Sequence, residues 1–163
     1  MNFPEMKKRE TTGGKFLKLV SKAPPVKGVI QGDPYLFESH YLGQGQRSQE
    51  CTGEGCLNCG KVGRPSEKFR VNFLMTENGV YVSKIFEGNY KSYNDLRAML
   101  DAGLDLSATV LQLSKSGEGK QTVVSIIPLG QLNEKQLEQI RQVSLHPLNS
   151  TTRTTTPDDS VPF

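Results

Sequence analysis

One histidine and all three cysteines of the chain lie close together in the sequence. His40 is followed by Cys51, Cys56 and Cys59 in the pattern His-x10-Cys-x4-Cys-x2-Cys. Imidazole and thiolate are the ligands that zinc prefers, and Cys-x2-Cys places two sulfurs on one tight turn. The pattern therefore predicts a Zn²⁺ site. Because four protein ligands leave no open coordination position, we expect this zinc to be structural and not catalytic.

Other interpretations of these residues stay open. Cys56 and Cys59 could form a redox pair of the thioredoxin type, although such a pair belongs to a βαβ setting that this sequence lacks. The thiols could also be free and structural. In place of His40, the fourth ligand could be Glu50, Glu54 or His146.

The three cysteines lie in a glycine-rich polar segment, residues 43–65, which fits neither a helix nor a strand. We expect Gly53, Gly55 and Gly60 to adopt backbone angles that other residues avoid, so that the chain can fold around the sulfurs. A loop of this length inside a small domain is otherwise without a reason to be ordered. The sequence thus predicts a zinc loop at 43–65.

The segments around the loop predict a mainly β fold. The pattern of apolar residues indicates a hairpin whose turn is Glu77-Asn78-Gly79 and a helix at 92–103, capped by Ser92 or Asn94. A second short helix is expected at 133–143, capped by Asn133, with Leu137 and Ile140 on its buried edge. Strands are expected at 16–20, 28–33, 34–42, 68–76, 80–86, 106–114 and 121–129.

This order of elements favours an oligonucleotide-binding (OB) barrel, a partly open five-stranded Greek key. One helix would lie between its third and fourth strands, and the short helix would follow the last strand. The chain of 163 residues has room for one domain. We expect a flexible basic arm at 1–14, the OB core at 15–143 and a disordered tail at 144–163.

Composition excludes some classes of protein. Apolar runs are far shorter than the roughly 20 residues that span a bilayer, and the N-terminus has no apolar signal core. An odd number of cysteines argues against a disulfide framework. We therefore expect a cytoplasmic protein without membrane contact.

Charge is distributed unevenly along the chain. Of its 20 basic and 17 acidic residues, only Arg153, Asp158 and Asp159 follow Ser144, so the body carries a net charge of +4 and the tail is acidic. A basic groove with interleaved aromatic rings is typical of proteins that bind single-stranded nucleic acid. The candidate contact residues are Lys18, Tyr35, Phe37, Tyr41, Arg47, Lys61, Arg64, Lys68, Arg70 and Tyr81.

The aromatic residues in that set also have a simpler interpretation. Alternation along one strand places Tyr35, Phe37 and Tyr41 on the same face. In a protein without tryptophan, however, Phe37, Phe69 and Phe73 fit a hydrophobic core better than a stacking platform. The tyrosines are the better platform candidates.

The last residues resemble the C-terminal tip of bacterial single-stranded DNA-binding proteins, an acidic run followed by Ile-Pro-Phe. Here the sequence reads Asp158, Asp159, Ser160, Val161, Pro162, Phe163, with a serine and a valine as departures from that pattern. The resemblance implies that Phe163 inserts into a pocket of partner replication or repair proteins. It also implies that the acidic residues bind a basic ridge on the same partner.

A second resemblance covers more of the chain. His40 and the three cysteines, placed within an OB-type barrel, are similar to the zinc-containing single-stranded DNA-binding proteins of T-even-type phages, although the first cysteine gap is shorter here. Lys7, Lys8 and Arg9 with the following threonines resemble the basic arm of that family, which implies cooperative self-association on DNA. Glu10 interrupts that motif.

Together these features predict a phage or mobile-element protein that coats single-stranded DNA during replication, recombination or repair and recruits partners through Phe163. A zinc-ribbon adaptor that binds only proteins is the main alternative. A nuclease or thiol oxidoreductase is disfavoured, because the sequence has no carboxylate cluster for Mg²⁺ and no redox setting.

Overall fold

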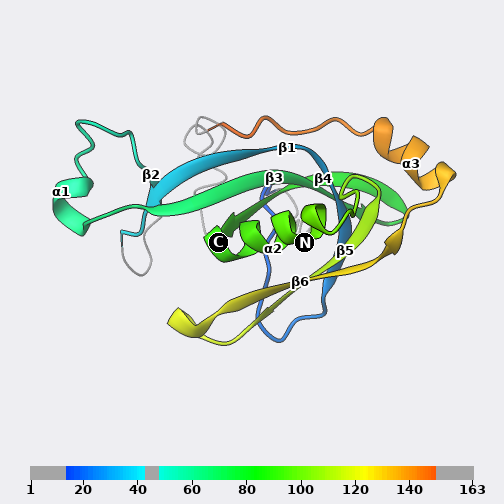
Figure 1. The fold of residues 1–163 in the computed structure, drawn as a ribbon, viewed down its shortest axis with the longest axis horizontal. Helices are drawn as coiled ribbons and strands as arrows, with labels where there is room; N and C mark the ends of the chain where they lie inside the picture. Colours follow the sequence, from blue (N-terminus) through cyan, green and yellow to red (C-terminus); the bar gives the residue numbers. More distant parts are fainter. Residues whose placement is uncertain (1–13, 43–47, 150–163) are drawn as a thin grey trace, which may run out of the picture.

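The computed structural model describes residues 14–42 and 48–149, and these residues form a mainly β structure with three α-helices (Figure 1). This confirms the prediction of a mainly β fold. The elements are β1 (Val26–His40), β2 (Gln49–Glu50), α1 (Cys59–Val62), β3 (Ser66–Glu77), β4 (Val80–Asn89), α2 (Tyr90–Asp101), β5 (Thr109–Ser116), β6 (Val123–Gln131) and α3 (Glu134–Arg141).

All strand pairs within the sheet are antiparallel. The order across the sheet is β4-β3-β1-β5-β6, and the two-residue strand β2 pairs with the end of β1. Within the described residues, β4 and β6 do not pair with each other, so the sheet stays open between them. Helix α2 contacts β3, β4 and β6 (Figure 1).

The two edges of this sheet are partly obstructed. Phe16 forms a parallel bridge to Ile85 on β4, and the backbone of Lys15 and Leu17 exchanges hydrogen bonds with Ile85. This bridge replaces the strand that was expected at 16–20, a prediction that was wrong. At the other edge, β6 contains Pro128, which lacks an N–H group.

β1 is one bent strand of 15 residues, whereas the sequence predicted two strands, at 28–33 and 34–42. Gly32 and Pro34 interrupt the pairing with β3 without ending the strand, because the register shifts between Gln31 and Tyr35. Gly32 has a φ of 78°, which is typical of the extra residue in a β-bulge. The bulge lets one strand serve both the sheet and the cysteine loop.

The predicted hairpin is confirmed. Asn78 has a φ of 52° and Gly79 a φ of 80°, and this pair of positive angles joins β3 to β4 as a type I′ turn requires. The hairpin is long, with paired residues from Glu77 and Val80 at the turn to Lys68 and Asn89 at the far end.

Both longer helices exist, but one cap was predicted wrongly. Helix α2 begins directly where β4 ends, and its N-cap is Asn89, whose side chain accepts a hydrogen bond from the backbone N–H of Ser92. Ser92 therefore lies inside the helix. Helix α3 has the predicted cap, since Asn133 and Gln136 form a reciprocal capping box.

Apolar side chains pack on both faces of the sheet. Phe69, Val71 and Phe73 of β3 point to the inner face, where they pack with Phe86, Leu96 of α2 and residues of β5 and β6. On the outer face, Val29 and Leu74 pack beneath Leu132 and Ile140, so α3 covers that part of the sheet. The predicted buried edge of α3 is confirmed at Ile140, while Leu137 is partly buried.

The chain continues after α3 across the same outer face. Residues 144–149, which we call the C-terminal strap, run back along β1 and β3 toward the end of the sheet that carries β2 and α1 (Figure 1, orange). The strap is irregular in structure. Of the predicted disordered tail, residues 150–163 lie outside the described residues, as does the arm at residues 1–13.

Among the described residues, no helix combines the length and the apolar character needed to cross a membrane.

Candidate metal centre and outer sheet face

β1 and the loop that follows it bring the four predicted ligands together. His40 ends β1, and the loop is joined to that strand by the pairing of β2 and by a hydrogen bond of 2.7 Å from the N–H of Cys51 to the carbonyl of Glu38. Cys59 begins α1. As a result, the imidazole nitrogen and the three sulfurs all lie within 4.8 Å of one another, close enough to hold a metal ion.

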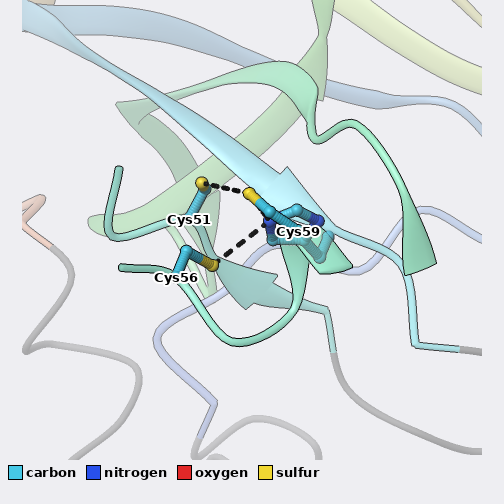
Figure 2. Close-up of side chains that lie close together, drawn as sticks. Cys51, Cys56 and Cys59 are labelled. Carbon is cyan, nitrogen blue, oxygen red and sulfur yellow. Dashed lines mark hydrogen bonds between the residues drawn. The ribbon is translucent and has the colours of Figure 1, made fainter. Parts of the chain in front are cut away.

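The individual distances in the cluster are short. Figure 2 shows the three cysteines close together, with the sulfurs of Cys51 and Cys59 3.7 Å apart. Nε2 of His40 lies 3.5 Å from the sulfurs of both Cys56 and Cys59. The alternative fourth ligand His146 is bound elsewhere, because its ring contacts the carbonyl of Ser83 on β4. His40, and not His146, therefore lies in the cluster with the three cysteines, as predicted.

Glycines shape this loop, as predicted for two of three positions. Gly53 and Gly55 have φ values of 83° and 81°, which β-carbon-bearing residues rarely adopt. Gly60 differs from the prediction, since it lies within α1 and is not among the residues of positive φ. The turn closes with a hydrogen bond from the N–H of Cys56 to the carbonyl of Gly53.

The imidazole and the three thiols differ in how deeply they are buried. His40 is only 1% exposed, and its Nδ1 has no hydrogen-bond partner among the described residues. Cys51 and Cys56 are half-buried and Cys59 is exposed. The site thus has one fixed, buried ligand on a strand and three sulfurs on an accessible loop.

The thiols also differ in acidity. A backbone hydrogen bond from Thr52 lowers the pKa of the Cys56 thiol to about 5. Hydrogen bonding with Cys51 raises the pKa of Cys59 to about 11. Near neutral pH, the Cys56 thiol is therefore deprotonated and the Cys59 thiol is protonated. A metal ion that binds Cys59 would have to displace its proton.

Four of the predicted contact residues come together on the outer face of the sheet. The register pairs Tyr35 with Arg70 and Phe37 with Lys68, so these side chains project from the same side of β1 and β3. The rings of Tyr35 and Phe37 stack with centroids 5.7 Å apart. The guanidinium of Arg70 lies 4.2 Å from the centroid of Phe37.

The two cations of this group are paired within the protein. Nε of Arg70 is 3.0 Å from one carboxylate oxygen of Glu87, and Nζ of Lys68 is 3.7 Å from the other. Arg70 is only 3% exposed and Phe37 is 9% exposed. Arg70, a candidate contact residue from the sequence, therefore offers little open surface in this conformation.

The other predicted contacts are scattered. Tyr81 lies on the outer face but packs against the apolar cluster beneath α3. Tyr41 is 68% exposed at the end of β1. Lys18, Lys61 and Arg64 are exposed outside the sheet. Outside the described residues lie Arg47, Lys7, Lys8, Arg9, Asp158, Asp159, Val161, Pro162 and Phe163.

Reasoning from the sequence missed Asn72 and Ser83. Asn72 is 3% exposed on the outer face, and its side-chain oxygen accepts a hydrogen bond of 2.9 Å from Ser83. A signal existed, because Asn72 follows Arg70 at a spacing of two, and the residues around them from Phe69 to Met75 are apolar. Two adjacent polar positions on one face indicate a partner for that face.

A pocket of about 620 Å³ lies between the cysteine loop, the β1–β3 pair and α2. Its lining includes the exposed side chains of Leu36 and Tyr90 and three carboxylates, those of Glu38, Glu50 and Glu67. Like charges repel, so this pocket disfavours a phosphate backbone. The outer face of the sheet is the better candidate for an anionic ligand.

Comparison of the chain with models of known families, with curated proteins and with solved structures yields no match.

Proposed function

We propose that this protein binds single-stranded DNA without sequence preference, on an OB barrel stabilised by zinc. The observation that carries the proposal is the strand order β4-β3-β1-β5-β6 with α2 between β4 and β5. With the two-residue β2 set aside, five strands and one helix follow each other as in the OB Greek key. OB folds bind oligonucleotides on the face of their second and third strands, which correspond to β3 and β4.

The composition of that face supports the same proposal. It carries the stacked rings of Tyr35 and Phe37 beside the cations of Lys68 and Arg70. Glu87 is shared between the two cations, so the group retains one net positive charge. Aromatic rings provide stacking surfaces for bases of any sequence, and cations attract the backbone.

The proposed metal is zinc. Two sulfurs at about 2.3 Å from a tetrahedral zinc lie about 3.8 Å apart, and a nitrogen and a sulfur lie about 3.5 Å apart. The 3.7 Å between Cys51 and Cys59 and the 3.5 Å from His40 to Cys56 and to Cys59 match these separations. A zinc held by one imidazole and three thiolates would fix the loop to the end of β1.

The partners proposed from the sequence extend this function. Phe163, behind Asp158 and Asp159, would bind replication or recombination proteins, and Lys7, Lys8 and Arg9 would support self-association along the strand. Both resemble motifs of proteins that coat single-stranded DNA, and a phage origin is consistent with the combination.

The test is fluorescence anisotropy of labelled poly-dT, against duplex DNA of equal length, across a salt series. We expect the single strand to bind far better than the duplex. The affinity should fall steeply as the salt concentration rises, because Lys and Arg side chains of the protein displace counterions that are condensed on the DNA. Equal binding of the two DNAs, or no binding at low salt, would refute the proposal.

A protein-binding adaptor is the second candidate, and one observation favours it. Leu57 is 81% exposed and Val62 is 45% exposed, both in the cysteine loop. If these two side chains form part of a larger apolar patch, that patch would suit contact with a protein. A zinc-loaded chain that ignores poly-dT at low salt would favour this candidate.

A further inference from the structure

The outer face of the sheet has an occupant, which is the chain itself. Asn72 makes two hydrogen bonds with one residue of the C-terminal strap: its Oδ1 accepts from the N–H of His146 at 2.8 Å, and its Nδ2 donates to the carbonyl of His146 at 3.0 Å. The imidazole Nε2 of His146 lies 2.9 Å from the carbonyl of Ser83. The strap is thus bound by side chains of β3 and by the backbone of β4.

Arg70 holds the next part of the strap. Its Nη1 donates to the carbonyls of Leu148 and Asn149, each at 3.3 Å. Because Arg70 also stacks on Phe37, the strap crosses the same aromatic and cationic group that the proposed function assigns to DNA. Strap and DNA cannot both occupy these donors.

Polar contacts hold the strap, and its apolar side chains add little. Neither apolar cluster includes any of residues 144–149, and Leu145 is 44% exposed. Val143, the residue just before the strap, does pack against the cluster beneath α3. Displacing the strap should therefore leave both apolar clusters in place.

The receiving groups also have partners outside the strap. Oδ1 of Asn72 accepts a hydrogen bond from Ser83. Arg70 forms an ion pair with Glu87 and contacts the ring of Phe37, so these contacts should hold both groups in position when the strap leaves. The groups that would become available are the Nδ2 donor of Asn72, one acceptor position on its Oδ1, and the Nη1 donor of Arg70.

These donors suit a nucleic acid as well as a peptide. An amide that binds the N–H and C=O of one peptide residue presents a donor and an acceptor, and the exposed Watson–Crick edge of each of the four bases in a single strand carries a matching pair. A guanidinium suits phosphate or carbonyl oxygens. A single-stranded nucleic acid offers both kinds of group, base edges and phosphate oxygens.

We propose that Asn72 and Arg70 form the single-strand-binding surface and that residues 144–149 occupy it as a displaceable internal ligand. This inference rests on the proposed function. Binding of DNA would require release of the strap. The apparent affinity for DNA would then be the intrinsic affinity multiplied by the fraction of molecules in which the strap is open. The strap is distinct from the acidic residues Asp158 and Asp159, which lie further along the chain.

Two truncations separate the strap from the remaining tail. A chain that ends at Asn149 keeps the strap, and a chain that ends at Val143 lacks it. With fluorescein-labelled dT oligomers, we expect the chain ending at Val143 to bind about threefold or more tighter than the chain ending at Asn149. Equal affinity of two folded chains that both bind dT overturns the inference and leaves the proposed function standing.

If the chain ending at Val143 does not fold, a point substitution tests whether the strap competes with DNA. His146→Pro removes the N–H that Asn72 accepts and the imidazole that contacts Ser83, in a chain of full length. We expect tighter dT binding, whereas His146→Ala, which keeps the backbone pair with Asn72, should give a smaller gain. Leu129→Ala, exposed on β6, is the control and should bind as the unchanged chain does. No gain from His146→Pro in a folded chain overturns the inference.

The role of Asn72 has its own readout. In the chain ending at Val143, Asn72→Ala should weaken dT binding by about fivefold or more, because the paired hydrogen bonds to the N3–H and a carbonyl of thymine are lost. Unchanged affinity with an unchanged melting temperature would overturn the assignment of Asn72. If no version of the chain binds dT or duplex at low salt, the proposed function fails, and the inference fails with it.

Discussion

The hydroxyl of Tyr35 donates a hydrogen bond of 2.7 Å to Oε1 of Glu50, the residue immediately before the candidate ligand Cys51. The other carboxylate oxygen, Oε2, is buried without a partner among the described residues. Tyr35 also stacks on Phe37. This single hydrogen bond therefore connects the cysteine loop to the aromatic group on the outer face of the sheet.

Removing that hydroxyl should loosen the loop. We expect Tyr35→Phe to lower the free energy of unfolding of the metal-loaded protein by about 1–3 kcal/mol, because a half-buried carboxylate loses its donor. Chemical unfolding measures the change. Tyr41→Phe is the matched control, since Tyr41 is 68% exposed and its hydroxyl has no described partner. Equal effects of the two substitutions would contradict the assigned role of Tyr35.

Cys59→Ser should abolish tight metal binding. Cys59 is exposed, so the substitution leaves no cavity, and any loss of stability reports on the missing ligand. We expect the metal affinity to fall by at least about a hundredfold, the upper end of what is lost when a residue that only orients a ligand is changed. Metal content by mass spectrometry and competition with a chelator measure it.

Leu57→Ala changes the same loop without touching a ligand and serves as the control. A Cys59→Ser chain that retains one tightly bound ion would show that the cluster is not the metal site.

Metal capture should release protons and should weaken as the pH falls. The pKa of Cys59, raised to about 11, keeps this thiol protonated near neutral pH, so a bound cation must displace that proton. Cys56, with a pKa lowered to about 5, contributes its own proton only as the pH approaches that value. Calorimetric titration of the metal-free chain in buffers of different ionisation enthalpy counts the released protons. A release of none at pH 7 would contradict this assignment.

Gly28→Ala should destabilise the sheet. A β-carbon at Gly28 would collide with the carbonyl oxygen of Leu74 and with the ring of Phe73 on the neighbouring strand. We expect a loss of about 1–3 kcal/mol in the free energy of unfolding, as for other overpacked cores. Gly60→Ala is the control, because nothing lies near its β-carbon position and its φ is not positive. Urea unfolding of both variants compares them directly.

Substitution of Phe73 and of Tyr41 should distinguish a ring that packs in the core from a ring that can stack on a base. Phe73 is fully buried, so Phe73→Ala should cost about 3–5 kcal/mol of stability. Tyr41 is exposed, so Tyr41→Ala should leave the melting temperature almost unchanged. If Tyr41 stacks on a base, its loss weakens dT binding by about 1–3 kcal/mol. Unchanged binding would remove Tyr41 from the proposed surface.

The local features of this fold could be predicted from the sequence. The turn at Asn78 and Gly79, the cap at Asn133 and the cluster of His40 with three cysteines each depend on residues within a short stretch of chain. Asn89 could not be recognised as a cap, because β4 passes into α2 without a loop, and the more obvious cap residues Ser92 and Asn94 fall inside the helix.

The burial of Arg70 could not be predicted in this way. It depends on Glu87, which is 17 positions away, and on strap carbonyls that are 78 and 79 positions away. A charged residue that alternates with apolar ones normally marks a solvent-facing side of a strand. Only the three-dimensional course of the C-terminal strap shows that this side is covered.

The partly obstructed edges of the sheet affect how molecules of this protein meet at high concentration. Open strand edges can pair with those of other molecules and lead to aggregation. Here residues 15–17 occupy part of the edge of β4, and Pro128 interrupts the row of donors on β6. These two obstructions should therefore help neighbouring copies of the protein to remain separate folded units at high concentration.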